Sequence, residues 1–350
     1  MNLDPGFAQL TPDRMLDALA RVGLHGDGRM LQLNSYENRV IQLHLEDGRA
    51  VVAKFYRPGR WSDAQILEEH AFAQELQQAE VPVVAPLMLG DSTLAHMDGL
   101  RFAVSPRQGG RAPELEDPEV LRWIGRFLAR LHLVGQRQPF QHRVRWDSAA
   151  PAREAQDWLA RHDSVGSQQA TAWHETARQC IAAIAAAFEA QPALATLRLH
   201  GDCHPGNILW TPDHGPHFVD LDDAVNGPAV QDLWMLLPGD PEVARRQLDA
   251  LLDGYESVRE FDHRELRLIE ALRTQRMIHH GAWLARRWDD PAFPLAFPWF
   301  GTPNYWSDQT VKLREQLEAM HAAVPGHGEH LGYGSRPEDD EDFEFDKGFR

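Results

Sequence analysis

Cysteine is scarce in this sequence, and no long apolar run occurs in it. The 350 residues include only two cysteines, Cys180 and Cys203, which excludes a disulfide framework and predicts a reducing, cytoplasmic location. The opening segment MNLDPGFAQL lacks the basic start and apolar core of a signal peptide, so we expect none. The longest apolar stretch, 180–197, is interrupted by Glu189 and Gln191, so we expect no membrane-spanning segment.

Positive charge is also scarce. Lysine and arginine total 35 against 52 aspartates and glutamates, which gives a formal net charge of −17. Nucleic acids and anionic membranes are bound by positively charged faces, so we expect neither as a partner. Hydrophobic residues at 43% and charged residues at 25% are typical of a globular protein. A chain of this length can bury a large core, as two domains or as one bilobal domain.

The pattern along the chain predicts an α+β fold with two lobes. In the N-lobe, residues 1–106, the expected elements are helices over 11–22 and from 62, and strands over 39–45, 50–56, 94–97 and 101–105. A connector rich in Gly, Pro and Arg over 107–113 is predicted to be a hinge. The C-lobe, 114–325, is expected to be mainly helical, with a strand-and-loop insert over 197–224. The acidic tail, 326–350, is expected to be disordered.

The densest group of polar residues is His-Gly-Asp-Cys-His-Pro-Gly-Asn at 200–207. An apolar strand follows, and Asp220 closes a second strand thirteen residues after Asn207, so a hairpin is expected to bring these side chains together. An amide oxygen and a carboxylate suit Mg²⁺. Asp202, earlier in the loop, is placed to accept a proton from an attacking hydroxyl. This order and spacing is typical of the catalytic loop of kinases.

Other interpretations of this region stay open at the level of sequence. The possible zinc ligands in the loop are His200, Asp202, Cys203 and His204. No matching distant ligand cluster accompanies them, which disfavours zinc. The adjacent Cys and His suggest a nucleophile pair, but a small buried thiol suits an extended loop better. Asp222 and Asp223 are further metal-ligand candidates, although solvated or capping carboxylates are the simpler interpretation.

A nucleotide site of this kind also needs a lysine on a strand, paired with a helix glutamate. Lys54 lies in the apolar segment VVAKFY, and the following helix offers Glu69, with Glu68 as the alternative. A surface lysine on an edge strand is the competing interpretation. The segment 33–40 is predicted to cover the phosphates through Ser35 and backbone amides. Neither a Walker A sequence nor a complete G-x-G-x-x-G occurs, which removes the main support for P-loop and Rossmann folds.

The His-Gly-Asp start makes the loop similar to that of the aminoglycoside phosphotransferase and choline kinase superfamily. Six segments, at 33–40, 51–61, 65–76, 197–210, 218–237 and 286–299, resemble a family of bacterial stress-response serine/threonine kinases with this fold. The resemblance spans about residues 8–320. It implies a bilobal, protein-kinase-like fold with an ATP-binding N-lobe and a catalytic, acceptor-binding C-lobe. It also implies a cytoplasmic, monomeric phosphoprotein that transfers the γ-phosphate of ATP to protein serine or threonine.

The same resemblance implies roles for individual positions in the C-lobe. Asp202 matches the family's proton acceptor, and Asp220 is its second catalytic carboxylate. Asn207 and Asp220 match its Mg²⁺ ligands. His200 and Asp232 match positions that brace the catalytic loop, and Asp232 is also suited to cap or anchor a helix beginning near residue 230.

In the N-lobe, Ser35 falls in the family's ATP-contacting loop, and Lys54 and Glu69 match its ion pair.

The acceptor is less defined, because members of the superfamily phosphorylate choline, homoserine, sugars or aminoglycosides, and a fold does not fix a substrate. A small-molecule hydroxyl kinase is therefore the alternative, and a nucleotide-binding pseudokinase is a third interpretation. Ten residues are candidates for an acceptor groove: Trp283, Trp288, Phe293, Phe297, Trp299, Trp306, Arg273, Arg276, Arg286 and Arg287.

Overall fold

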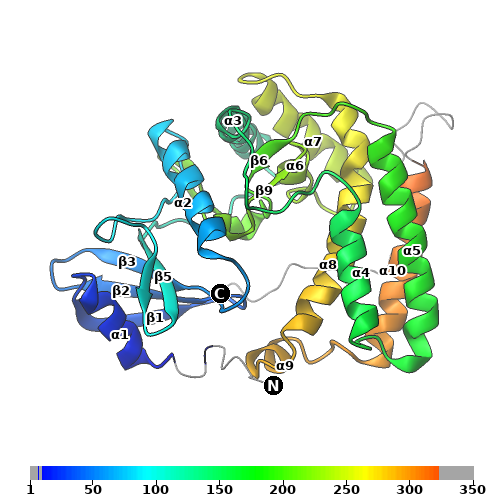
Figure 1. Cartoon of the computed structure of the whole chain (residues 1–350). Coiled ribbons are helices and arrows are strands. Elements are labelled where there is room, and N and C mark those ends of the chain that lie inside the picture. Colours follow the sequence, from blue (N-terminus) through cyan, green and yellow to red (C-terminus); the bar gives the residue numbers. More distant parts are fainter. Residues whose placement is uncertain (1–6, 8–9, 323–350) are drawn as a thin grey trace.

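The computed structural model describes residues 7 and 10–322 and has an α+β fold with two lobes (Figure 1). The smaller lobe comprises α1 (Pro12–Arg21), β1 (Gly26–Leu33), β2 (Arg39–Leu45), β3 (Ala50–Phe55), α2 (Asp63–Gln78), β4 (Ala95–Met97) and β5 (Leu100–Pro106). Its strands form one antiparallel sheet in the order β1-β2-β3-β5-β4. The α+β fold class predicted from the sequence is confirmed. The predicted acidic tail, 326–350, lies outside the described residues.

Helix starts and strand register in this lobe follow from local sequence. Thr11 caps α1 by accepting a hydrogen bond from the main-chain N of Arg14, and Ser62 forms a reciprocal capping box with Gln65 at α2. In the sheet, Lys54 of β3 lies opposite Val40 of β2 on one side and Ala103 of β5 on the other. Lys54 is therefore on a central strand, and the edge-strand interpretation is wrong.

Strand β1 was not predicted from the sequence. Six of its eight residues are exposed, because it forms one edge of the sheet and its outer side has no partner strand within the described residues. An exposed edge strand has no buried face to enforce alternation of apolar and polar side chains. Its pairing with β2 nevertheless places the connecting residues 34–38 at the end of a hairpin.

The larger lobe is mainly helical. Its helices are α3 (Pro118–Gly135), α4 (Ala150–Arg161), α5 (Ser167–Glu189), α6 (Gln231–Trp234), α7 (Pro241–Glu256), α8 (Ile269–Arg286), α9 (Ala292–Ala296) and α10 (Pro303–Ala322). Its strand pairs are β6 (Leu197–Leu199) with β9 (Val225–Gly227), and β7 (Ile208–Thr211) with β8 (Gly215–Phe218). Short 3₁₀ turns are η1 (Pro205–Asn207), η2 (Leu221–Asp223) and η3 (His263–Leu268).

Two glycines allow α3 and α7 to pack at very short range. A Cβ atom on Gly125 of α3 would lie 2.1 Å from the main-chain oxygen of Leu251, and one on Gly254 of α7 would lie 2.0 Å from that of Arg122. Neither contact is sterically allowed, so only glycine fits at both positions. The main chains of the two helices are therefore in direct contact at these glycines.

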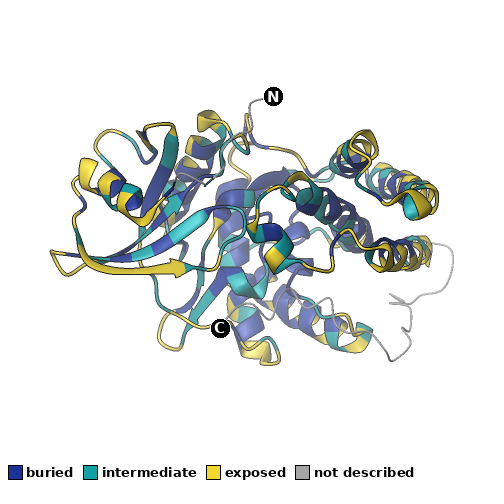
Figure 2. Ribbon diagram, turned by 90° about the horizontal axis from the view of Figure 1, so that it is seen from below, coloured by how far each residue is buried: buried dark blue, intermediate teal, exposed yellow. Residues whose placement is uncertain are grey.

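Helix α2 joins the cores of the two lobes. Its Phe72 and Leu76 belong to the large hydrophobic cluster of the helical lobe, whereas its Ile66 packs with Tyr56 and Ala103 of the sheet lobe. Figure 2 shows buried residues running through the middle of the molecule and exposed residues on its outer faces. The lobes therefore share continuous packing on the α2 side.

The connector 107–113 also contacts the larger lobe. The main-chain N and O of Arg111 exchange hydrogen bonds with those of Trp210 in β7, at 3.0 and 2.6 Å. A Cβ atom on Gly110 would lie 2.8 Å from that of Leu209, so this glycine permits the close approach. The connector thus lies directly beside the β7–β8 hairpin, and its role as a hinge stays a prediction.

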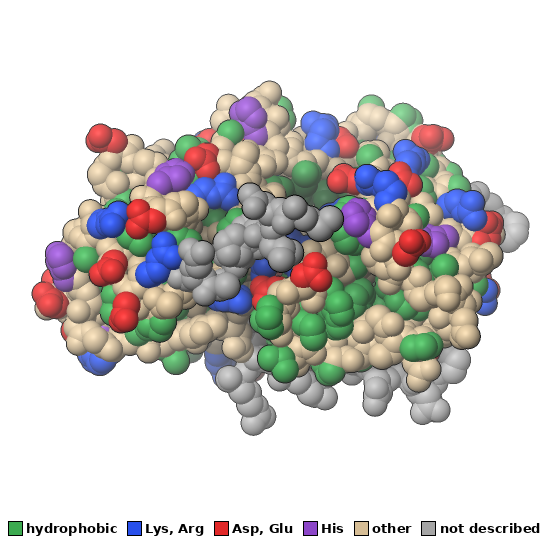
Figure 3. Space-filling model, turned by 60° about the horizontal axis from the view of Figure 1, so that its bottom comes forward, with side chains coloured by type: hydrophobic (Ala, Val, Ile, Leu, Met, Phe, Trp, Pro, Cys, Tyr) green, Lys and Arg blue, Asp and Glu red, His purple; other side chains and the backbone are tan. Residues whose placement is uncertain are grey.

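The described surface carries charges of both signs. On the face shown in Figure 3, Lys and Arg side chains are interspersed with Asp and Glu over both lobes. The described part of the chain contains no helix that is long and apolar enough to cross a membrane.

A buried carboxyl group in η3 predicts a pH-dependent stability. Glu265 accepts a hydrogen bond from the main-chain N of Val230 at 2.8 Å, and burial raises its pKa from 4.5 to about 7. The folded state therefore keeps a proton that the unfolded state has lost, and this stabilising contribution disappears as pH rises through about 7. We expect the unfolding free energy of the wild type, relative to Glu265→Gln, to fall by about 3 kcal/mol between about pH 4 and 8. Urea titrations of both proteins across this pH range would measure the difference in their unfolding free energies. A difference that stays constant with pH would contradict the prediction.

Candidate active site

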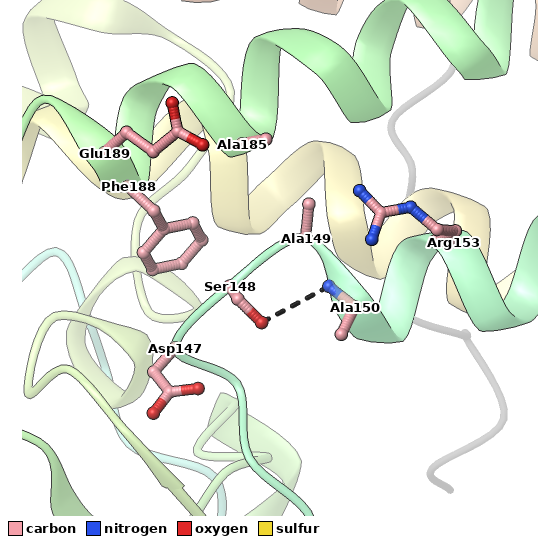
Figure 4. A pocket seen from close by; sticks show the side chains of 8 residues that line it. All are labelled: Asp147, Ser148, Ala149, Ala150, Arg153, Ala185, Phe188 and Glu189. Atoms are coloured by element: carbon pink, nitrogen blue, oxygen red, sulfur yellow. Dashed lines mark hydrogen bonds between the residues drawn. The ribbon is translucent and has the colours of Figure 1, made fainter.

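A cavity of about 1680 Å³ lies where the two lobes face each other. It is lined by the β1–β2 connection 34–38, by the loop after β6, by the segment after β8 and by α8. Of the residues assigned from the sequence to catalysis, ATP binding and Mg²⁺ binding, Ser35, Asp202, Asn207 and Asp220 line it. A second hollow of about 380 Å³ lies between the start of α4 and the end of α5 (Figure 4). None of the predicted site residues lines that smaller hollow.

One buried carboxylate holds the main chain of the loop 200–207. Asp232 of α6 accepts hydrogen bonds from the main-chain N atoms of His200 and Gly201, both at 2.8 Å. The Nε2 atom of His132 on α3 lies 3.1 Å from the same carboxylate, and its Nδ1 atom lies 2.8 Å from the hydroxyl of Tyr255. Because Asp232, His132 and Tyr255 are fully buried, this chain of hydrogen bonds is shielded from water. Asp232 lies within α6 and does not cap it, so that part of the expectation is wrong.

His200 ties the loop to the strand that precedes Asp220. Its Nε2 atom hydrogen-bonds the main-chain oxygen of Val219 at 2.9 Å, and its Nδ1 atom accepts from the main-chain N of Asp202 at 3.3 Å. Gly201 has φ +83°, and a Cβ atom there would lie 2.1 Å from the main-chain oxygen of Asp223. Only glycine satisfies both conditions, so the loop and the segment 219–223 are held in fixed register.

These contacts argue against zinc in the loop. Both ring nitrogens of His200 are used within the fold, and Nδ1 of His204 accepts from the main-chain N of Gly206 at 3.0 Å. Cys203 is fully buried, and burial raises the pKa of its thiol well above the ordinary value. No group of three His, Cys, Asp or Glu side chains suited to hold a metal occurs within residues 7 and 10–322. The thiol is a buried core group, as expected from the sequence.

Asp202 and Asn207 lie next to each other at the mouth of the loop. The Nδ2 atom of Asn207 donates to the main-chain oxygen of Asp202 at 2.9 Å and lies 3.5 Å from its Oδ2 atom. The main-chain oxygen of Asn207 accepts from the N atom of Val219 at 3.0 Å, within the β7–β8 hairpin region. The expected hairpin therefore forms, and it brings Asn207 to the strand that leads into Asp220.

Asp220 has an unusual backbone conformation and a cationic partner. Its φ of 59° and ψ of 63° are left-handed, which is costly for a residue with a side chain and is typical of functional positions. The carboxylate is 49% exposed toward the cavity, and its Oδ1 atom lies 2.7 Å from Nζ of Lys54. Burial alone would lower the pKa of the mostly shielded Lys54 ammonium, but the charges of Asp220 and Asp222 outweigh this effect and hold the pKa well above its ordinary value.

The structure does not form the expected ion pair between Lys54 and Glu69. Within the described residues, the Lys54 ammonium pairs with Asp220 at 2.7 Å and approaches Asp222 at 4.0 Å, but no contact within 4.0 Å joins it to Glu69. Glu69 is buried near Lys54, and burial raises its pKa to about 7. Glu68, the alternative, instead accepts from main-chain N atoms of residues 141–143. Glu69 is thus the glutamate beside Lys54, although Asp220 holds the lysine in this structure.

The β1–β2 connection 34–38 is anchored to both lobes. Ser35 Oγ accepts from the main-chain N of Asn38 at 3.3 Å, and Nδ2 of Asn38 donates to Asp222 at 3.1 Å. Arg60 also pairs with Asp222, at 2.6 Å, and with Asp223. Asp222 is buried in this network, so the interpretation of it as a solvated or capping carboxylate is wrong. Sequence reasoning missed Arg60, because its partner lies 162 positions away.

Glu37, in the same connection, contacts the helical lobe. Its carboxylate lies 2.6 Å from Nε of Arg287, 2.7 Å from Nε1 of Trp283 and 3.2 Å from Nε of Arg57. Arg57 also pairs with Asp290 at 2.9 Å. These mostly buried contacts fix the connection against α8 and the segment after it. The sequence gives no local signal for this arrangement.

Removing the charge of Glu37 is expected to destabilise the protein. Glu37→Gln leaves arginine side chains facing one another without their shared carboxylate, and breaking a buried ion pair costs about 3–5 kcal/mol. Urea denaturation of both proteins would measure the loss. Glu154→Gln is the matched control, because Glu154 lines the same cavity but meets Arg286 only at 4.0 Å and is largely exposed. Equal stabilities of the two variants would contradict the prediction.

Only some of the candidate acceptor-groove residues line the cavity. The candidates that line the cavity are Trp283, Phe297, Trp299, Arg276, Arg286 and Arg287. Phe293 and Trp306 are instead buried in the hydrophobic cluster around α5, α8 and α10, and Trp288 packs against that cluster. Arg273 pairs with Glu270 on its own helix. The aromatic and arginine residues therefore divide between the cavity wall and the core.

The fold and the site together define a class. Two lobes enclose a cavity into which a braced Asp-x4-Asn loop and a separate aspartate project, and a lysine from the central strand contacts that aspartate. This is the arrangement of kinase-type phosphotransferases. The chain belongs to the phosphotransferase enzyme family, whose sequence profile matches residues 30–269.

Curated relatives cover almost the whole chain. "Stress response kinase A" of Salmonella choleraesuis (strain SC-B67) is 45% identical over 315 residues, which are 90% of this chain and 95% of that protein. "Serine/threonine protein kinase RdoA" of Salmonella typhimurium is 46% identical with the same coverage. "Stress response kinase A" of Escherichia coli (strain K12) is 46% identical over 314 residues, 90% of this chain and 94% of that protein.

Solved structures with low sequence identity share the fold. The amicoumacin kinase hAmiN, in complex with AMP-PNP, Ca²⁺ and Ami, superposes with a TM-score of 0.70 at 17% identity, covering 91% of this chain and 96% of that one. A microcompartment-associated aminopropanol kinase gives a TM-score of 0.66 at 16% identity, covering 89% and 97%. These matches support the bilobal fold.

Proposed function

We propose that this chain is an ATP- and Mg²⁺-dependent serine/threonine protein kinase, acting in the bacterial stress response. The observation that supports this most strongly is the convergence of Asp202, Asn207 and Asp220 on one cavity, with Lys54 held against Asp220. The relatives named as serine/threonine and stress response kinases support the protein acceptor and the physiological role.

In the proposed reaction, each residue acts on charge or position. Asp202 orients the acceptor hydroxyl and takes its proton as the oxygen attacks the γ-phosphorus, while the bond from that phosphorus to the β-phosphate oxygen breaks and ADP leaves. Lys54, from the central strand, holds the phosphate oxygens, and Ser35 with the backbone of 34–38 covers them. His200 and Asp232 keep the loop fixed, so the carboxylate needs no rearrangement when the transition state forms.

The donor set fits a divalent cation. Asn207 uses its Nδ2 atom for hydrogen bonds to Asp202, which leaves its amide oxygen as a ligand, and the exposed Asp220 carboxylate supplies a second hard oxygen. Mg²⁺ prefers few protein ligands of this type together with water and phosphate oxygens. When bound there, it would neutralise charge on the phosphates.

A small-molecule hydroxyl kinase is the second candidate. The observation that favours it is the fold itself, which the chain shares with kinases named for amicoumacin and aminopropanol. The cavity volume of about 1680 Å³ exceeds the roughly 300–1,000 Å³ typical of a site for one small ligand, so it leaves room for an acceptor of either kind beside the nucleotide.

The test is transfer of radiolabelled γ-phosphate from Mg²⁺-ATP, with a generic protein acceptor and a panel of small alcohols offered in parallel. Label on protein serine or threonine that disappears in Asp202→Asn would support the proposal. Label on a small alcohol alone would replace it with the second candidate. Nucleotide binding without any transfer would identify a pseudokinase.

A further inference from the structure

The two oxygens of the Asp202 carboxylate have different partners. Oδ1 lies 2.5 Å from Nη2 of Arg276, a short ion pair. Oδ2 lies 3.5 Å from Nδ2 of Asn207 and 3.7 Å from Nε2 of His204, both longer than a good hydrogen bond. Asp202 and Arg276 are 19% and 22% exposed, so the pair is partly shielded from water at the cavity wall. One oxygen is therefore firmly held, whereas the other is weakly engaged.

Arg276 comes from a rigid part of the larger lobe. It lies near the middle of α8, where the neighbouring side chains of Ile278 and Ala282 are fully buried in the core. Helix α8 contacts α4, α5 and α10, so its position is fixed from several sides. A guanidinium group is planar and presents its N–H donors in a fixed direction, unlike the flexible ammonium of lysine. Arg276 can therefore hold a carboxylate in one orientation.

The loop alone does not fix this carboxylate. Asp232 and His200 hold the main chain of the loop, through the N atoms of residues 200–202 and the oxygen of Val219. Within the loop, the contacts of the Asp202 side chain with Asn207 and His204 are long, at 3.5 and 3.7 Å, and hold it only weakly. Arg276 supplies the short contact to the side chain, from an element 74 positions further along the chain.

We propose that Arg276 is a positioning residue for phosphoryl transfer, which holds Oδ1 of Asp202 so that Oδ2 faces the acceptor hydroxyl. The inference rests on the proposed function, because it assigns Asp202 to the acceptor. Misplacing a reacting group by about 1 Å can cost about 10²-fold in rate. We therefore expect Arg276→Ala to lower kcat about 10²-fold while the KM for ATP changes little.

The experiment compares kcat and KM for Arg276→Ala, Arg276→Lys and the control Arg273→Ala. Arg273 lies one turn earlier on α8 and pairs with Glu270 at 2.8 Å, so its loss tests damage to the helix alone. Arg276→Lys keeps the charge but loses the planar fork, and we expect an intermediate rate. Added guanidinium, at a concentration that leaves the fold intact, should partly restore Arg276→Ala and leave Arg273→Ala unchanged. Thermal unfolding of each variant verifies folding.

A double-mutant cycle with Asp202→Asn separates positioning from a direct role. If Arg276 acts through Asp202, the kcat of the double variant should be within about twofold of the kcat of Asp202→Asn. This margin is the deviation from additivity that independent sites show. Additive losses, or a kcat for Arg276→Ala equal to that of Arg273→Ala, would overturn the proposal.

Intrinsic ATP hydrolysis, with water as the acceptor, gives a readout that does not depend on the protein acceptor. Phosphorylation of small alcohols only would overturn the protein-kinase assignment, while the Arg276 effect would still be measured on those alcohols. Absence of any ATP turnover by the wild type would overturn both.

Discussion

Replacing Asp202 by asparagine is expected to remove phosphoryl transfer almost completely while the protein stays folded. Asparagine has the same size and keeps an oxygen that can accept from Arg276, so the loop should retain its contacts. It cannot take a proton from a hydroxyl. Loss of general-base catalysis typically costs about 10²–10⁴-fold in rate. We expect kcat to fall by this factor, with an unchanged melting temperature and unchanged nucleotide binding.

The matched variants for this prediction are Asp220→Asn and Asp213→Asn. Asp220→Asn replaces the charged cation ligand by a neutral amide oxygen and removes the negative charge that pairs with Lys54, so we expect it to reduce both transfer and the dependence of ATP binding on Mg²⁺. Asp213 lies exposed in the turn of the neighbouring hairpin, and its replacement should have no effect. A folded Asp202→Asn variant with wild-type kcat would refute the role assigned to this carboxylate.

The parts of the site that follow from short-range sequence were predictable. The Asp-x4-Asn spacing, the hairpin that leads to Asp220, and Lys54 in an apolar strand are all encoded within one or two neighbouring elements. The caps at Thr11 and Ser62 likewise depend on residues only three positions apart. Sequence patterns carry such information because the interacting groups lie close along the chain.

The remainder depends on how distant elements pack. Arg276 reaches Asp202 across 74 positions, and Glu37 reaches Trp283 across 246. Local patterns contain no signal for such pairs, because the tertiary fold alone brings them together. The same limit explains why Lys54 contacts Asp220 and not the expected Glu69. It also explains why Asp222 is buried against Arg60, although its neighbours in sequence suggested a solvated side chain.

Asp232→Ala is expected to cause the largest loss of stability among single changes around the loop. It removes the acceptor for two buried main-chain N–H groups and for His132, and leaves a small cavity. Each unsatisfied buried donor costs about 1–3 kcal/mol, so we expect a decrease of about 3–5 kcal/mol in unfolding free energy. Because the same carboxylate fixes the loop that carries Asp202, phosphoryl transfer should fall even under conditions where the variant remains folded.

Urea denaturation measures the first effect, and transfer assays well below the denaturation midpoint measure the second. Asp240→Ala is the control, because Asp240 caps α7 through the main-chain N of Val243 at 2.8 Å, on the exposed side of the protein. Losing such a cap costs about 1 kcal/mol and should leave activity intact. Asp232→Asn keeps one acceptor oxygen and is expected to lie between the two. If Asp232→Ala were no less stable than Asp240→Ala, the Asp232 carboxylate would not be what holds the loop. Another acceptor, such as water or His132, would then satisfy the main-chain N–H groups of His200 and Gly201.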